Sequence, residues 1–151
     1  MKLIINGRVF EREIPADKML LDLLRELGYF GVKRGCDTEN CGLCTVWVDG
    51  RPVLSCSYPA MRAAGREITT IEGVREEAEA FGRAMADRGA EQCGFCSPGF
   101  VMTVLAMKRE LTHPTEEEVK AYLAGNLCRC SGYTSQTEAV MAYLEEAQQW
   151  Q

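Results

Sequence analysis

The sequence contains a single histidine and no run of about eighteen apolar residues, the length that a membrane-spanning helix needs. An integral membrane protein is therefore not expected. The histidine, His113, precedes Pro114 in a segment typical of an exposed turn. No Ser/His/Asp or Cys/His catalytic arrangement is predicted, so we expect no catalytic residue in the chain. The first twenty residues lack the apolar core of a signal peptide, and we expect a cytoplasmic location unless a partner with its own export signal carries the chain elsewhere.

A basic surface is also missing. The chain has 17 Lys and Arg residues against 22 Asp and Glu residues, which gives a net charge of −5. Residues 1–76 are balanced, and the acidic excess lies in residues 77–151, where we expect a solvated acidic face on helices. Nucleic-acid binding needs clustered Lys and Arg, so no nucleic-acid partner is expected. The chain also lacks a P-loop and a dinucleotide-binding fingerprint.

Eight cysteines stand out against these absences, and they fall into two sets of four. The first cysteine set reads Cys36-x4-Cys41-x2-Cys44 and is completed, after an interval of eleven residues, by Cys56. The Cys-x4-Cys-x2-Cys run is the spacing of plant-type ferredoxins, in which four thiolates hold a [2Fe-2S] cluster. Thiols stay reduced in the cytosol, so metal binding is favoured over disulfides.

The second cysteine set reads Cys93-x2-Cys96, then a gap of thirty-one residues, then Cys128-x-Cys130. Two short-spaced pairs also suit a structural zinc site, so zinc stays open for this set taken alone. Zinc is disfavoured for the first set, where three ligands share one loop. The presence of that loop in the same chain favours a second [2Fe-2S] cluster here. Two clusters on one chain indicate an electron relay, because one site can feed the next.

The first half of the chain has the pattern of a small mixed sheet packed on a helix. Turn signals at Asn6-Gly7 and Asp49-Gly50 predict two hairpins, over residues 2–10 and 45–54. Leucines at helical spacing predict a short helix over Met19–Leu27, and Ile68–Ile71 is a further strand.

The second half has the pattern of helices, and the change falls near Glu72-Gly73. Ser97-Pro98 should cap and open an apolar helix that must be buried. Thr115 and Glu118 form a capping-box pattern. The expected helices run from about Val74 to Gly89, from Ser97 to Leu111, from Thr115 to Gly125, and from Thr134 to Gln149.

Glycine-rich loops surround both cysteine sets, and they let backbone amides approach the sulfurs closely. The second set should converge at the common end of two helices, because each of its pairs lies just before a predicted helix. The positive N-termini of those helices would favour a more negative, reduced cluster.

Three motifs stand around the cysteines: Gly35–Val46 at the first set, and Gln92–Gly99 and Gly125–Tyr133 at the second. Together they resemble the small iron–sulfur subunit of the xanthine dehydrogenase/aldehyde oxidoreductase family of molybdenum hydroxylases. The resemblance covers nearly the whole chain. It implies an α+β protein: a β-grasp ferredoxin-like domain over residues 1–73 with one [2Fe-2S] cluster, followed by a four-helix [2Fe-2S]-binding domain over residues 74–151.

The resemblance also implies partners and further cofactors. A large subunit would hold molybdenum-pterin and the substrate, and a medium subunit usually holds FAD. Electrons would leave molybdenum, pass the helical-domain cluster and then the ferredoxin-domain cluster, and reach FAD. By position, Gln92 and Cys130 match family residues that lie beside the pterin. One departure falls at Ser135-Gln136-Thr137, where family members commonly carry apolar residues.

Two other functions compete with an electron-transfer subunit. The first is a free-standing two-cluster ferredoxin that shuttles between enzymes. The second is a zinc-stabilised adaptor without redox activity. A soluble shuttle has no need of a four-helix domain that ends in a pterin-facing Cys-x-Cys, so the subunit is the favoured interpretation. The substrate is recognised in another chain and is not encoded here.

Overall fold

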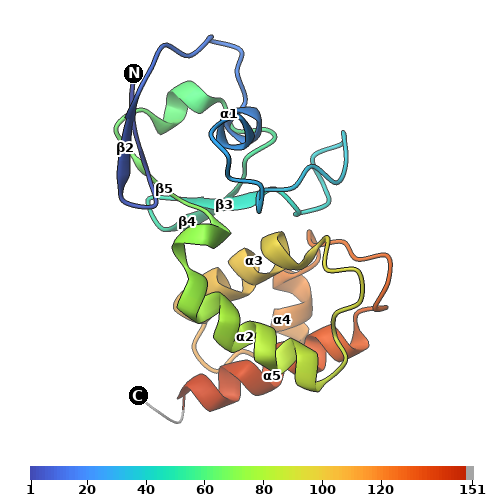
Figure 1. The fold of residues 1–151 in the computed structure, drawn as a ribbon. Helices are drawn as coiled ribbons and strands as arrows, with labels where there is room; N and C mark the ends of the chain where they lie inside the picture. The colour runs from blue at the N-terminus through green and yellow to red at the C-terminus, as the bar shows by residue number, and fades with distance from the viewer. Residues whose placement is uncertain (149–151) are drawn as a thin grey trace.

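The computed structural model describes residues 1–148, with a small sheet in one half and helices in the other (Figure 1). The sheet half contains β1 (Lys2–Ile5), β2 (Arg8–Glu11), α1 (Leu20–Glu26), β3 (Thr45–Val48), β4 (Arg51–Leu54), the 3-10 helix η1 (Ala60–Ala63) and β5 (Glu67–Thr69). After a second 3-10 helix, η2 (Ile71–Gly73), the helical half contains α2 (Arg75–Asp87), α3 (Ser97–Glu110), α4 (Glu116–Tyr122) and α5 (Thr134–Gln148). This confirms the α+β fold class, with a sheet domain followed by four helices.

The sheet has the strand order β2-β1-β5-β3-β4, with β1 and β5 parallel and the other pairs antiparallel. Both predicted hairpins are confirmed. Their turns place Asn6-Gly7 and Asp49-Gly50 at positive φ, between 50° and 77°, the conformation that a two-residue hairpin loop requires. The strand predicted over Ile68–Ile71 ends at Thr69, before the predicted last residue. The N–H of Thr70 donates to Asn6 Oδ1 (2.9 Å), so the chain leaves the ladder there and enters η2.

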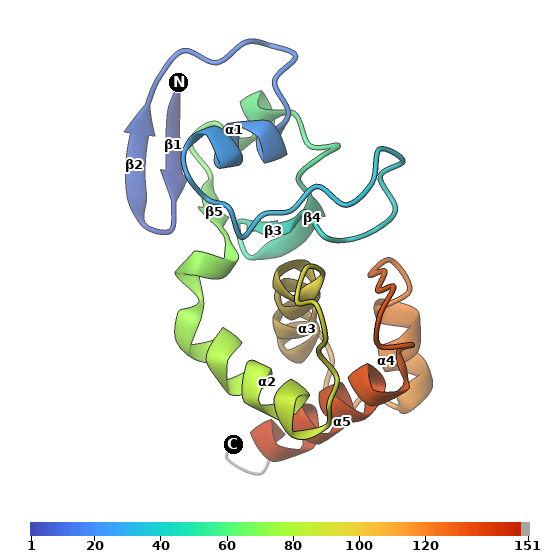
Figure 2. The ribbon, with the colours of Figure 1, turned by 45° about the vertical axis from the view of Figure 1, so that its right-hand side comes forward.

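Helix α1 covers the side of the sheet that faces away from the other helices (Figure 2). Its leucines 20, 21, 23 and 24 are buried with Leu3, Ile5 and Ile68 in one core. The predicted helix is thus confirmed, and the chain turns at Gly28, where φ is +92°. Strand β3 is buried on both faces, because α1 lies on one side and α3 on the other.

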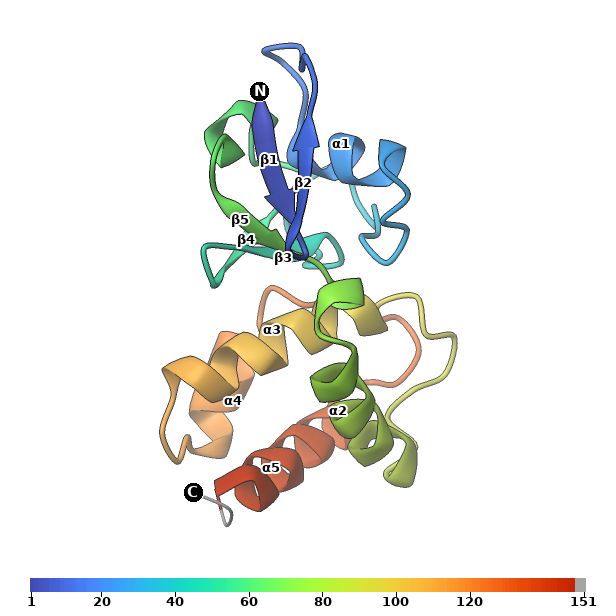
Figure 3. The same ribbon diagram turned by 60° about the vertical axis from the view of Figure 1, so that its left-hand side comes forward.

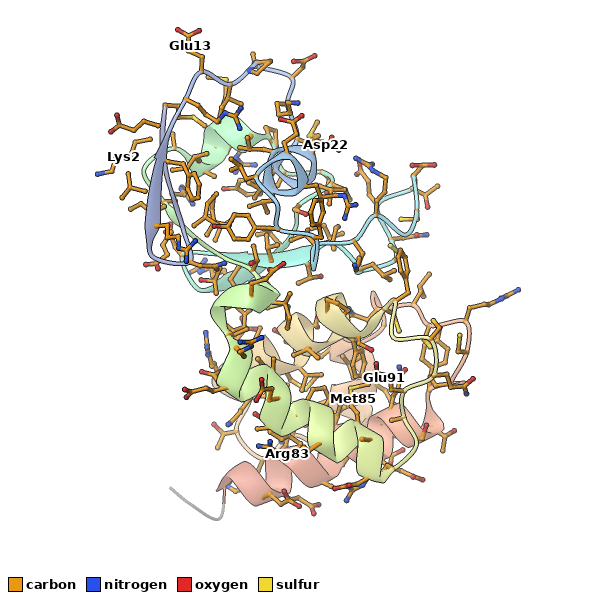
Figure 4. The ribbon with its side chains drawn as sticks, viewed as in Figure 1. Lys2, Glu13, Asp22, Arg83, Met85 and Glu91 are labelled. Carbon is orange, nitrogen blue, oxygen red and sulfur yellow. The ribbon has the colours of Figure 1, made fainter. Side chains whose placement is uncertain are left out.

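The helical half has its own core around α3, in which every residue from Gly99 to Met107 is buried, as its apolar sequence predicts. Met85 of α2, labelled in Figure 4, belongs to this core. The expectation that Ser97 caps α3 was wrong: the cap position is Cys96, whose side chain makes no capping hydrogen bond, and Ser97 is already helical. Cys96 already has helical φ and ψ angles (−80° and −18°), so the helical turn begins one residue before the position that the Ser-Pro pattern predicts.

The remaining helices follow the sequence closely. Helix α4 begins with the predicted capping box between Thr115 and Glu118. His113 lies exposed in the turn before it. Helix α5 begins at Thr134 as expected, and the predicted last residue, Gln149, lies outside the described residues. Among residues 1–148, no helix combines the length and the apolar character needed to cross a membrane.

The connection between the halves is η2, which leads from β5 into α2 (Figure 3). It is anchored to the sheet half, since Glu72 Oε1 accepts a hydrogen bond from the Gly31 N–H (2.8 Å). A Cβ at Gly73 would lie 2.3 Å from Asn6 Oδ1, so the turn also packs tightly on the first hairpin. Apart from Trp47, whose side chain belongs to the core of the helical half, the buried residues of the two cores lie on either side of this point, which supports our proposal of a domain boundary after residue 73.

Candidate metal centres

The first cysteine set gathers at one end of the β3–β4 hairpin. Cys36 and Cys41 lie in the loop after α1, Cys44 directly precedes β3, and Cys56 follows β4. The hairpin register pairs the first residue of β3 with the last of β4, so Cys44 and Cys56 are brought together although they are distant in sequence. Ser55 fixes this end of the hairpin, since its hydroxyl donates to the Cys44 carbonyl (2.7 Å).

The loop around Cys36 is folded so that its main-chain amides point at the sulfur. Hydrogen bonds from the N–H groups of Asn40 and Thr38 lower the pKa of the Cys36 thiol to about 6. Burial raises the pKa of Cys41, whose sulfur is in hydrogen-bonding contact with that of Cys36. These amides stabilise a thiolate, which is the form that binds a metal.

Cys56 completes the first set from the strand side. Its pKa is raised to about 12 by burial first, and then by its hydrogen-bonding contact with the Cys44 sulfur. The first set is therefore arranged as two contacting pairs, Cys36 with Cys41 and Cys44 with Cys56. A thiol this difficult to ionise in a metal-free protein needs a cation beside it to become a ligand.

The second cysteine set lines one cavity in the helical half. Cys93 and Cys96 come from the loop that leads into α3, where Glu91 is labelled in Figure 4, and Cys128 and Cys130 come from the loop between α4 and α5. The sulfurs of Cys93 and Cys130 are 3.6 Å apart. Cys96 is in hydrogen-bonding contact with Cys128, and its pKa is raised to about 11, chiefly by burial. The predicted convergence of the second set is thus seen in the structure.

Cys128 is the sulfur in this set with the most hydrogen-bond donors. Burial opposes its ionisation, but donors from Ser131 and Cys130 lower its pKa to about 7. They are the Ser131 hydroxyl (3.2 Å) and the N–H groups of Ser131 and Cys130 (both 3.4 Å). Hydrogen bonds of this kind to ligand sulfurs tune the reduction potential of an iron–sulfur centre.

Tyr133 also supports this loop, and our sequence analysis gave it no role. Its hydroxyl accepts a hydrogen bond from the Cys128 N–H (3.0 Å) and donates one to the Cys128 carbonyl (2.9 Å). Gly132 and Tyr133 both have positive φ, at 76° and 74°, which turns the chain back on itself. A glycine followed by a residue with a hydroxyl, directly after Cys-x-Cys, was the signal that could have identified it.

The arrangement of both sets suits a binuclear cluster. Within residues 1–148, no three Cys, His, Asp or Glu side chains are placed around one common point for a metal ion. Each set instead forms two contacting sulfur pairs, and a [2Fe-2S] cluster takes two cysteines on each iron. The backbone also stays close to the sulfurs, since a Cβ at Gly35 would lie 3.2 Å from Cys41 Sγ and 2.5 Å from Leu43. The residues present therefore fit a [2Fe-2S] cluster in each set.

The two residues that the resemblance places beside a pterin are joined to each other. Gln92 Nε2 donates a hydrogen bond to the Cys130 carbonyl (3.1 Å), and both residues are exposed. Three large apolar side chains are exposed in the same loops: Phe95 (49%), Leu127 (45%) and Tyr133 (43%). The second cysteine set thus lies at the surface, beside apolar groups that a protein partner could cover.

The two cysteine sets are linked by the main chain. The N–H of Leu127, the residue before Cys128, donates to the Cys41 carbonyl (2.9 Å). Glycines allow this approach: a Cβ at Gly42 would lie 2.4 Å from the Gly125 oxygen, and one at Gly99 would lie 2.4 Å from the Gly42 oxygen. Figures 1 and 2 both show the loop before β3 close to the helical half.

Comparison with known proteins finds two matching families in the same order. Residues 3–70 match the family described as 2Fe-2S iron-sulfur cluster binding domain, and residues 70–141 match the [2Fe-2S] binding domain family. The xanthine dehydrogenase iron-sulfur-binding subunit of Escherichia coli O157:H7 is 45% identical over 136 residues, covering 85% of this chain and 84% of that protein.

Solved structures with the same fold include single subunits and parts of longer chains. A chain of quinoline 2-oxidoreductase from Pseudomonas putida 86 superposes with a TM-score of 0.87 and 37% identity, covering 99% of this chain and 95% of that one. Aldehyde oxidoreductase from Desulfovibrio desulfuricans ATCC 27774 gives a TM-score of 0.89 and 34% identity, over 98% of this chain but only 17% of that one.

Proposed function

Because the chain belongs to the small [2Fe-2S] iron–sulfur subunits of the molybdenum hydroxylase family, which includes xanthine dehydrogenase and aldehyde oxidoreductase, we propose that it transfers electrons within a larger complex. Under this proposal, electrons leave the molybdenum-pterin centre of a large subunit, pass through two [2Fe-2S] clusters in this chain, and continue towards FAD in a medium subunit. The chain is a non-catalytic part of an oxidoreductase complex.

The proposal assigns all eight cysteines as ligands. Cys36, Cys41, Cys44 and Cys56 hold one cluster, and Cys93, Cys96, Cys128 and Cys130 hold the other. When bound, each cluster accepts and releases one electron at a time. The chain contributes main-chain and hydroxyl donors that stabilise the negative sulfurs, notably around Cys36 and Cys128.

The observation that carries the electron-relay function is the hydrogen bond from the Leu127 N–H to the Cys41 carbonyl (2.9 Å). Cys41 belongs to the first cysteine set, and Leu127 is bonded to Cys128 of the second. A single hydrogen bond therefore connects a ligand of one cluster to the chain that carries a ligand of the other. A protein with two independent structural metal sites has no need of such a connection.

The exposure of the cysteines supports the proposed direction of transfer. Cys93 and Cys130 are exposed, and Gln92 lies beside them, so we place the second cysteine set against the molybdenum-pterin subunit, with Gln92 and Cys130 at the pterin. In the first set Cys41 and Cys44 are buried, while residues 37–40 of the same loop are exposed. We place this loop towards the FAD subunit.

Composition and stepwise reduction of the purified complex test the proposal. Two [2Fe-2S] clusters correspond to about four iron and four acid-labile sulfides per chain, and partial reduction should give two distinct paramagnetic signals. Zinc in place of iron would indicate a structural adaptor. A chain that purifies with both clusters but without larger subunits would indicate a free-standing carrier.

A matched pair of glycine variants tests the link between the sets. Gly99→Ala places a Cβ 2.4 Å from the Gly42 oxygen and 2.7 Å from Leu43 Cα, so the loop of the first set must move away. Gly125→Ala is the control, because a Cβ there meets nothing within 4 Å. We expect Gly99→Ala to slow electron equilibration between the two clusters and weaken their magnetic interaction, with iron content retained. Equal rates in both variants would contradict the proposed relay path.

A further inference from the structure

Gln136 is a buried polar residue without a hydrogen-bond partner. It lies near the start of α5, its residue is only 3% exposed, and its side-chain oxygen makes no hydrogen bond within the described part of the chain. Among residues 1–146, whose side chains the structure describes, it is the only one with a buried nitrogen or oxygen atom in this condition. Leaving such a group unpaired costs about 1–3 kcal/mol, so buried amides in folded proteins normally have a partner.

The position of Gln136 indicates where the partner lies. Its side chain lines the same cavity as Cys93, Cys96, Cys128 and Cys130. Of the other polar side chains that line this cavity, Gln92 donates to the Cys130 carbonyl and Glu91 is exposed, which leaves Ser97 and the four cysteines. Four of the lining residues are cysteines, and a cluster bound by them would add inorganic sulfides, so sulfur is the partner that this cavity would offer Gln136 once a cluster is bound.

The chemistry of a carboxamide matches such a partner. The oxygen and nitrogen ends of a glutamine are assigned from their surroundings, and the nitrogen carries two donors. Thiolate and sulfide sulfurs carry negative charge and accept hydrogen bonds. When the surroundings are sulfurs, the amide nitrogen is the end that should face them.

We propose that the Gln136 carboxamide donates a hydrogen bond to a sulfur of the cluster held by the second cysteine set, and so raises the reduction potential of that cluster. The inference rests on the proposed function, because it requires a [2Fe-2S] cluster at this position. A donor to sulfur stabilises the more negative, reduced state, and hydrogen bonds to sulfur are among the factors that set these potentials. Gln136 acts through the ligand sphere and is a positioning residue.

Redox titration of the complete complex, followed by electron paramagnetic resonance, tests this role. Gln136→Met keeps the length of the side chain and removes both donors. We expect the midpoint potential of the second cluster to fall, with an equilibrium constant for reduction up to about tenfold smaller, which is 59 mV for a one-electron couple. The first cluster should keep its potential.

Thr103→Val is the matched control for a general effect of removing a buried polar group. Thr103 is 7% exposed and donates to the Gly99 carbonyl (3.0 Å), not to the second cysteine set. We expect both cluster potentials of the Thr103→Val variant to equal those of the unaltered protein. A similar fall in Thr103→Val and Gln136→Met would overturn the assignment, since it would show a packing effect.

An isotope measurement tests the same contact by a second, independent observable. In protein labelled with 15N in glutamine side chains, pulsed paramagnetic resonance of the second cluster should show a weak nitrogen coupling. The coupling should persist in Gln92→Ala and disappear in Gln136→Met. If both clusters give normal signals, but no nitrogen coupling is seen and Gln136→Met does not shift the potential, the role of Gln136 is overturned while the proposed function stands. Failure to find a [2Fe-2S] signal from the second set in the unaltered protein would overturn the proposed function itself.

Discussion

The indole Nε1 of Trp47 donates a hydrogen bond to the main-chain carbonyl of Met102 (3.0 Å). Trp47 belongs to β3 of the sheet half, yet its ring is buried in the core of the helical half. The guanidinium carbon of Arg109 lies 3.9 Å from the centre of its ring. A sheet residue thus fixes α3, the helix whose N-terminus carries Cys96.

Replacing Trp47 should therefore weaken the attachment of the two halves. Trp47→Phe removes the hydrogen bond and should cost about 1 kcal/mol, whereas Trp47→Ala also leaves a cavity and should cost about 3–5 kcal/mol. Thermal unfolding of the cluster-loaded protein, followed by circular dichroism, measures the change. Val9→Ala, at an exposed position of β2, is the control and should have little effect.

Each cluster should depend on its own cysteine set. Cys56→Ser should remove the paramagnetic signal of the first cluster and spare the second, because the partners of Cys56 all lie in residues 36–44. Cys128→Ser should have the reverse effect. Loss of both clusters from either change would show that the halves fold as one unit, and that the proposed boundary after residue 73 is wrong.

Gln92→Ala should separate cofactor contact from cluster binding. The variant loses the hydrogen bond to the Cys130 carbonyl, and under our proposal also a contact with the pterin. A lost hydrogen bond costs about 1–3 kcal/mol when the remaining group is buried, so we expect weaker molybdenum retention or slower reduction of the clusters by substrate. Dithionite bypasses molybdenum and should reduce both clusters normally. Full molybdenum content with normal substrate-driven reduction would refute the contact.

The start of α4 should give a pH-dependent stability. The Thr115 N–H and hydroxyl donate to Glu118, and these bonds lower the pKa of its carboxyl group. A lowered pKa in the folded state means that the contribution is present above the unfolded value, about 4.3, and is lost as the pH falls through the folded value.

Thr115→Ala should accordingly lower Tm by roughly 2–4 °C at pH 7. The difference from the unaltered protein should shrink when the same measurement is made in acid, because Glu118 becomes protonated as the pH falls through its folded pKa. Thr112→Ala, in the same turn but outside the capping box, is the control and should match the unaltered protein at both pH values. An undiminished difference at low pH would contradict the assigned role of Glu118.

Local features of the structure were predictable because their causes lie within a few residues. Asn6-Gly7 and Asp49-Gly50 specify hairpin turns by themselves, and Thr115 with Glu118 specifies a helix start. The convergence of each cysteine set was predictable because its spacing is one that proteins use to hold a cluster. Ser97 misled because Cys96 occupies the cap position instead.

Features that depend on tertiary contact were not predictable. Trp47 gave no sign that its partner lies 55 residues away on α3. The Leu127 hydrogen bond to Cys41 depends on how the two halves meet, and no local pattern encodes that. Gln136 looked like a departure from the family, and only its burial in the cysteine-lined cavity showed what it faces.

The glycine contacts between the two cysteine loops have a consequence for the spacing of those loops. Where Gly42 meets Gly99 and Gly125, the surfaces in contact are peptide units, whose dimensions are fixed by covalent bonds. These glycines have no side-chain rotamers whose change could alter the distance between the contacting peptide units. The spacing between the two cysteine loops is therefore insensitive to the side-chain motion that warming increases, so it should vary little with temperature while the fold persists.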